Sequence, residues 1–164
     1  MVAEAAAMTE SIWFTDSLIR IHVTPEDTNG AYALAEILQP SGHVTPPHVH
    51  ENDAESFFLM EGEITVHTQD GPTVIRPGQA GHIPAGVAHT LCVTSAGPAR
   101  AVLVSAPSHF IEYVRACGRP AEREALPTLD GPPDIGLLLR EAPAYGMTVL
   151  GPPGALPVDV VSEV

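Results

Sequence analysis

Three histidines and one glutamate in the middle of the chain have the residue types and the spacing of metal ligands. His48 and His50 stand one residue apart, and Glu55 follows in the same stretch, GHVTPPHVHENDAESFFLMEG. His89 comes shortly after a Pro-x-Gly turn in a second stretch, GQAGHIPAGVAH. Three imidazoles and one carboxylate form a complete ligand set for a divalent transition metal. The sequence therefore predicts that His48, His50, Glu55 and His89 surround one ion.

The segments that carry these residues are expected to be β-strands. Alternate residues of a strand share a face, so His48 and His50 would project together. Pro46 and Pro47 cannot donate to a sheet, so the segment would enter the sheet at or after Pro47. Glu55 opens the next expected strand, 55–60. Apolar residues near it would either line a substrate pocket or simply form the barrel core: Phe57, Leu59, Ile64 and Val66.

The pattern of short segments predicts an all-β domain. At 164 residues the chain is long enough for one domain with its own core. Its 17 prolines and 14 glycines separate short β-rich runs, which favours an antiparallel sandwich or barrel. Residues 31–39 have helical propensity, but they follow an Asn-Gly hairpin signal and are predicted to be a strand. Further strands are expected at 11–14, 18–23, 64–67, 73–76, 80–83, 89–94 and 100–105.

The C-terminal third is expected to be partly helical. Ser108 would cap a helix over 108–116, with Gly118 as its stop and Phe110, Ile111 and Val114 on one stripe. A second short helix is expected over 134–142 and a last strand over 147–150. The predicted organisation is a flexible tail (1–10), a barrel domain (11–150) with a helical extension (108–142), and a poorly ordered Pro-rich tail (151–164).

Composition excludes several classes of partner. With 7 basic and 20 acidic residues the formal charge is −13, and no basic patch is present, so nucleic acid and anionic membranes are not expected partners. No run approaches the ~20 apolar residues of a membrane span. The N-terminus lacks the pattern of a secretory signal, so the expected location is the cytoplasm. Cys92 and Cys117 are expected to be two separate, partly buried thiols.

The remaining five histidines are expected to be ordinary polar residues: His22, His43, His67, His82 and His109. His43 and His82 lie inside the two ligand-bearing stretches. They are therefore candidates for hydrogen bonds that orient the ligands from outside the first ring of contacts.

The two stretches resemble the two motifs of the cupin superfamily. The first motif is written G(X)5HXH(X)3–4E(X)6G, and its positions are occupied by Gly42, His48, His50, Glu55 and Gly62. The second is written G(X)5PXG(X)2H(X)3N, and its positions are matched by Gly78, Pro84, Gly86 and His89. Val93 stands where the family often has asparagine, which is not a metal ligand. The strand pattern around the motifs extends the resemblance to residues 11–107, and the helix and tail that follow resemble those of small single-domain cupins described as quercetin-dioxygenase-like.

The resemblance implies a double-sheet jelly-roll barrel with the ion inside one mouth. In cupin dioxygenases the same ligand set leaves positions open for water, substrate or dioxygen, and the glutamate also acts as a base. Glu55 would then be both a ligand and the acid–base residue. The ion would be iron, nickel, manganese, cobalt, copper or zinc. Many cupins are homodimers that exchange an N-terminal strand, and the segments 12–14 and 18–23 suit such an exchange.

Three functions are compatible with these residues. The first is a dioxygenase that acts on a small aromatic or enolic, flavonol-like substrate together with dioxygen. The second is a non-redox isomerase, cyclase or lyase that uses the metal only to polarise a carbonyl. The third is a small-ligand-binding module without turnover. A fold does not decide between them, so the site must.

Overall fold

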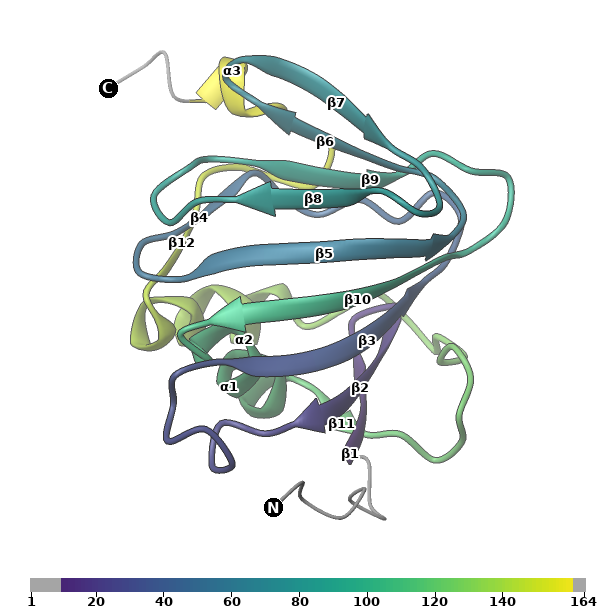
Figure 1. The fold of residues 1–164 in the computed structure, drawn as a ribbon, viewed down its shortest axis with the longest axis vertical. Helices are drawn as coiled ribbons and strands as arrows, with labels where there is room; N and C mark the ends of the chain where they lie inside the picture. Colours follow the sequence, from purple (N-terminus) through teal and green to yellow (C-terminus); the bar gives the residue numbers. More distant parts are fainter. Residues whose placement is uncertain (1–9, 161–164) are drawn as a thin grey trace.

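The structure, a computed structural model, describes residues 10–160 and confirms the expected antiparallel two-sheet architecture. The larger sheet has seven strands in the order β11-β1-β2-β3-β10-β5-β8. Their bounds are β1 Glu10–Phe14, β2 Ser17–Val23, β3 Ala33–Gln39, β5 Ala54–Glu61, β8 Ala80–Ile83, β10 Ala99–Ala106 and β11 Arg119–Pro120. Figure 1 shows these strands stacked along the long axis of the molecule.

Two smaller sheets complete the barrel. One has the order β7-β6-β9, and the other pairs β12 with β4. Isolated bridges from Val44 to Cys92 and from His48 to His89 join the segment around β4 to β9, so the two smaller sheets form one layer. The bounds are β4 His48–His50, β6 Ile64–Thr68, β7 Gly71–Ile75, β9 Thr90–Val93 and β12 Met147–Val149.

Helices follow the last long strand. They are α1 His109–Cys117, α2 Ile135–Glu141, the 3-10 helix η1 Ala142–Tyr145 and α3 Pro157–Val160. In Figure 1, α1 and α2 lie behind the strands β2, β3 and β10. Ile111 and Val114 of α1 are fully buried in the main core, so the predicted apolar stripe packs on the barrel. No helix among the described residues has the length and apolar character needed to cross a bilayer.

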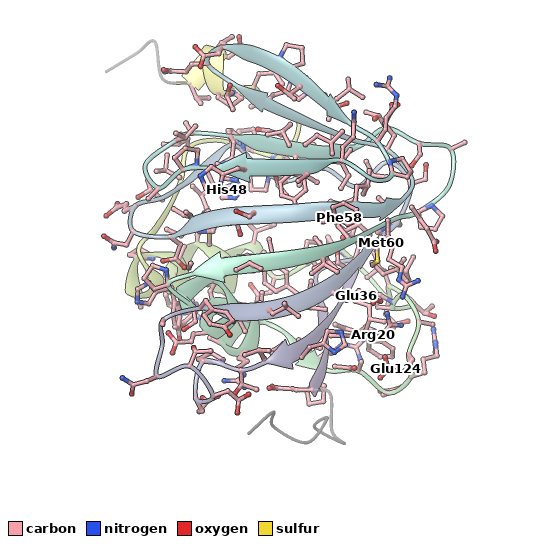
Figure 2. All side chains as sticks on the ribbon, viewed as in Figure 1. Arg20, Glu36, His48, Phe58, Met60 and Glu124 are labelled. Carbon is pink, nitrogen blue, oxygen red and sulfur yellow. The ribbon has the colours of Figure 1, made fainter. Side chains whose placement is uncertain are left out.

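The core lies between the layers because the strands alternate. β3 and β10 bury every second residue, as expected for strands with one face inward. The 31–39 segment is thus a strand (β3), and its antiparallel pairing with β2 follows the turn predicted at residues 25–30. The outer face carries ion pairs beside apolar side chains such as Phe58. Figure 2 shows Arg20 between Glu36 and Glu124 on this face.

Some details differ from the sequence-based expectations. Ser108 occupies the N-cap of α1, but its side chain makes no capping hydrogen bond, and the carboxylate of Asp53 takes over that role. Asp134 does cap α2, through the N–H of Leu137. Glu10 belongs to β1 and not to a tail. The segment from 151 to 160, expected to be poorly ordered, ends in α3, where Pro157 is buried. Residues 1–9 and 161–164 lie outside the described part of the chain.

Candidate metal centre

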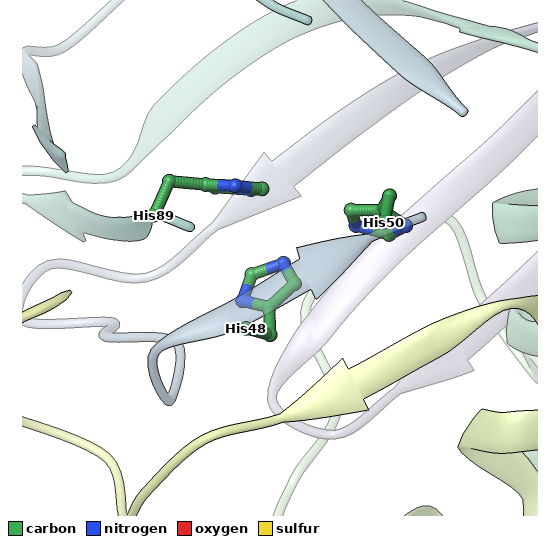
Figure 3. A group of neighbouring side chains, drawn as sticks. All are labelled: His48, His50 and His89. Carbon is green, nitrogen blue, oxygen red and sulfur yellow. The ribbon is translucent and has the colours of Figure 1, made fainter. Parts of the chain in front are cut away.

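Two elements bring the three predicted histidine ligands together. His48 and His50 lie on β4, where alternate residues face the same way. His89 directly precedes β9, and its backbone exchanges two hydrogen bonds of 3.0 Å with that of His48. This reciprocal pair places the two residues opposite each other on adjacent strands. The side chains of all three histidines are at most 8% exposed, and Figure 3 shows them converging.

The ligand atoms are close enough to share one ion. One nitrogen from each of His48, His50 and His89 lies within 4.8 Å of the others. Their ring centroids are 4.2 Å apart for His48 and His89, and 5.0 Å apart for His48 and His50. The structure therefore brings together the three imidazoles that the spacing predicts.

Glu55 reaches this cluster from strand β5 of the seven-stranded sheet, which is not hydrogen-bonded to β4 or β9. Its Oε2 atom is 3.6 Å from Nε2 of His50 and 3.6 Å from Nε2 of His89, and the residue is buried. All four predicted ligands thus meet at one place, with the carboxylate beside two of the three imidazoles.

Hydrogen bonds fix which nitrogen is available in two of the three rings. Nδ1 of His48 is 2.8 Å from the carbonyl oxygen of Pro46, and Nδ1 of His89 is 3.0 Å from that of Val87. A carbonyl only accepts, so each Nδ1 must carry the proton and each Nε2 keeps a lone pair. Nε2 of His50 is buried without a hydrogen-bond partner. Buried polar atoms normally have partners, so an unpartnered nitrogen beside the two Nε2 lone pairs fits a metal ion.

The electrostatics favour the protonation states that metal binding needs. Burial, reinforced by the neighbouring imidazoles of His89 and His50, lowers the pKa of His48 to about 3. Burial also lowers the pKa of His50. For Glu55 burial acts in the opposite direction, but the surrounding imidazoles outweigh it and lower the pKa of the carboxyl to about 2. Neutral imidazoles and an ionised carboxylate are the forms that ligate divalent ions.

The four predicted pocket residues are part of the main hydrophobic core. Phe57, Leu59, Ile64 and Val66 are each at most 5% exposed and pack in one cluster. Phe57 and Leu59 share the inward face of β5 with Glu55, as expected. Contact of any of the four with a substrate stays a prediction. A separate surface cleft of about 380 Å³ opens elsewhere, beside Trp13 and residues 128–134, and none of the four candidate ligands lines it.

The two histidines considered for outer hydrogen bonds bind other partners. Nδ1 of His43 is 2.7 Å from Oδ1 of Asp16, and Nδ1 of His82 is 2.9 Å from Oγ of Ser56. His82 is exposed on β8. Their hydrogen bonds therefore go to residues other than the four candidate ligands.

Sequence reasoning missed two residues beside the site. Phe110 packs its ring perpendicular to that of His50, with centroids 5.4 Å apart. Asp53, in the short connection between β4 and β5, is only 2% exposed and holds the start of α1. Nothing in the sequence indicated that Asp53 is buried, because a single aspartate in a short connection is usually exposed to solvent. The contact of Phe110 could not be read from its helical stripe.

Residues 35–105, which contain both ligand-bearing stretches, match the family model described as "Cupin domain". The chain contains a cupin domain. Quercetin 2,3-dioxygenase of Bacillus subtilis (strain 168) is 27% identical to the chain over 137 residues, which are 84% of this chain and 40% of that protein. The chain thus spans less than half the length of this curated relative.

Solved structures show the same cupin fold. A predicted oxalate decarboxylase from Thermotoga maritima superposes with a TM-score of 0.55 and 19% identity, covering 65% of this chain and 99% of its own. The polyketide cyclase RemF from Streptomyces resistomycificus superposes with a TM-score of 0.50 and 21% identity, covering 76% and 82%. The cupin barrel therefore accommodates proteins described by different activities, and the fold alone does not select one.

Proposed function

We propose that this cupin is a metal-dependent dioxygenase that acts on a small aromatic or enolic substrate, with His48, His50, His89 and Glu55 as the ligands of one divalent ion. The observation that carries the proposal is the buried convergence of three imidazoles, two of which have Nε2 3.6 Å from the carboxylate of Glu55. The similarity to quercetin 2,3-dioxygenase supports the choice of an oxygenase over other cupin activities.

The donor set fits an ion of intermediate hardness. Imidazole nitrogen combined with carboxylate oxygen suits manganese, iron, cobalt, nickel, copper and zinc, whereas calcium and magnesium prefer oxygen alone. When bound, such an ion acts as a Lewis acid towards an oxygen atom of the substrate. A flavonol or related enol supplies that oxygen as a hydroxyl group whose proton must leave.

Glu55 is the residue of this chain best placed to receive that proton. Its carboxylate is buried among the imidazoles, and its low pKa means that it enters the reaction ionised. The carboxylate can hold that proton on Oε2, which lies 3.6 Å from Nε2 of His50 and of His89. Hydrogen bonds from Nδ1 to backbone carbonyls hold His48 and His89 in place and leave each Nε2 free to act as a ligand.

Oxygen consumption tests the proposal. Apoprotein would be reconstituted separately with iron, nickel, cobalt, manganese, copper and zinc, and incubated with a flavonol in an oxygen electrode. We expect oxygen uptake with at least one redox-active ion and none for His50→Ala. The matched control His82→Ala changes an exposed histidine on β8 and should retain activity.

Two results would redirect the assignment. Turnover that zinc supports in full, without oxygen uptake, would replace the oxygenase with a non-redox isomerase, cyclase or lyase. Flavonol that binds and is recovered unchanged with every ion would indicate a ligand-binding module. Glu55→Gln separates the two roles of the glutamate: retained metal with lost turnover identifies a base, and lost metal identifies a ligand.

A further inference from the structure

The residues that follow the matched cupin domain reach the candidate metal centre from two directions. Strand β12 pairs with β4 so that Met147 lies opposite His50 and Val149 opposite His48. Backbone hydrogen bonds of 2.8 Å extend this pairing at both ends of β4, from Glu51 to Gly146 and from Leu150 to Pro47. The strand that carries two ligands is therefore held on one edge by His89 and on the other by the C-terminal extension.

The second approach is through the side chain of Phe110. Its ring stands at 90° to the imidazole of His50, with centroids 5.4 Å apart. Behind it, the ring of Phe14 lies 6.4 Å away at 88° and limits its movement. Nε2 of His50 has no hydrogen-bond partner, so its direction depends on packing rather than on a fixed polar contact. A perpendicular aromatic contact of this kind restricts rotation of the imidazole.

Asp53 determines where Phe110 sits. Its Oδ2 atom accepts hydrogen bonds from the backbone N–H of Phe110, at 3.0 Å, and from Oγ of Ser105, at 3.1 Å. Its Oδ1 atom is 2.6 Å from Nδ1 of His109. This buried carboxylate replaces Ser108 as the cap of α1, although it belongs to the connection between β4 and β5. It thereby ties the first turn of α1 to the chain between His50 and Glu55.

We propose that Asp53 and Phe110 are positioning residues of the metal centre, and that the extension after residue 105 is a working part of it. Asp53 anchors the start of α1, α1 presents the ring of Phe110, and that ring holds the imidazole of His50 in the orientation that ligation requires. The proposal rests on the metal site of the proposed function. It adds two residues from outside the ring of ligands, one of them outside residues 35–105.

The test is titration of the full-length apoprotein with Co²⁺, followed by visible absorption. The position of the absorption bands reports ligand geometry, and the titration gives the dissociation constant. The informative variants are Phe110→Leu and Asp53→Ala. Matched controls come from the same extension. Tyr113→Leu removes a buried aromatic of α1 whose ring contacts are with Phe14 and Tyr145, and Asp134→Ala removes the cap of α2.

The proposal predicts a separation between the two pairs of variants. Phe110→Leu and Asp53→Ala should shift the cobalt bands and raise the dissociation constant about tenfold, the usual effect of losing a group that orients a ligand. Tyr113→Leu and Asp134→Ala should lower the melting temperature and leave the bands in place. Asp53→Asn keeps an acceptor for the N–H of Phe110 and should restore the wild-type spectrum.

Three outcomes would overturn the inference. Unshifted bands and an unchanged dissociation constant in folded Phe110→Leu would remove the role of the ring, whatever happens to Asp53→Ala. Equal shifts in the controls would show that general loosening of the extension is the cause. Both outcomes leave the proposed function intact, whereas a wild-type protein that binds no Co²⁺ would overturn the inference and the proposed function together.

Discussion

Gly42 and Gly62 frame the first ligand-bearing stretch, and the structure predicts very different costs for replacing them with alanine. Both adopt a left-handed conformation, with φ of +77° and +82°. A Cβ atom on Gly42 would meet nothing within 4 Å, whereas one on Gly62 would lie 2.7 Å from the Cα atom of Ala99 and from the carbonyl oxygen of Pro98. Both glycines occupy glycine positions of the same sequence motif, but of the two only Gly62 is packed against backbone atoms of another segment.

The expected losses of stability follow from the left-handed backbone conformation and from the steric clash of the added Cβ atom. The left-handed conformation costs a non-glycine residue about 1 to 2 kcal/mol, and both variants incur that cost. Forcing an atom into packed backbone adds about 1 to 3 kcal/mol, for Gly62→Ala alone. For a chain of this length each kcal/mol lowers the melting temperature by about 2 to 4 °C. Gly62→Ala should therefore melt roughly 4 to 8 °C below Gly42→Ala, taking about 2 kcal/mol as the difference.

Unfolding followed by tryptophan fluorescence measures this difference. The chain has a single tryptophan, Trp13, which is 4% exposed and reports the loss of the core. Urea titrations of the two variants and the wild type would give the free energies of unfolding. Equal losses for Gly42→Ala and Gly62→Ala would refute the reasoning, because they would show that the close approach of residues 98 and 99 to Gly62 has no energetic weight.

Three further predictions concern charge, metal and thiols. Arg100, and then Arg20, hold the pKa of the Glu36 carboxyl below its usual value of 4.5. The ionised carboxylate therefore contributes about 1 kcal/mol of stability, which is complete above pH 4.5 and is lost as the pH falls through the lower folded-state pKa. In urea unfolding at several pH values, Glu36→Gln should be less stable than the wild type at pH 7 and nearly equal to it at the most acidic pH. A divalent ion at one hundred times its dissociation constant should stabilise the fold by about 2.7 kcal/mol, which raises the melting temperature by roughly 5 to 11 °C in calorimetry, and a chelator should reverse the shift. Burial raises the pKa of the Cys92 thiol, so it should react with a thiol reagent more slowly in the folded protein than in urea, and equal rates would contradict its placement.

Much of the barrel could be predicted because its signals are local. Alternating apolar residues, the Asn-Gly turn, and the prolines before His48 predicted nearly every strand of the barrel. The segment 31–39 shows how one local signal outweighs another, since its helical propensity yields to the hairpin with β2. The ligand set was equally accessible, because His48 and His50 share a face by strand geometry alone.

Contacts between distant segments could not be predicted in this way. Nothing local shows that β12 pairs with β4, that Asp53 caps a helix more than fifty residues later, or that Phe110 packs on His50. These contacts depend on the path of the whole chain around the barrel. The expected homodimer and the cytoplasmic location stay predictions, and β1 pairs with β2 and β11 of its own chain.

The most direct test of the central claim is the metal content of the purified protein, measured by elemental analysis and by equilibrium dialysis against a divalent transition metal. Three buried imidazoles and Glu55 predict one ion per chain in the wild type. The same stoichiometry should persist in His82→Ala and disappear in His50→Ala. A wild-type protein that retains no ion, or a His50→Ala variant that retains as much as the wild type, would contradict the account.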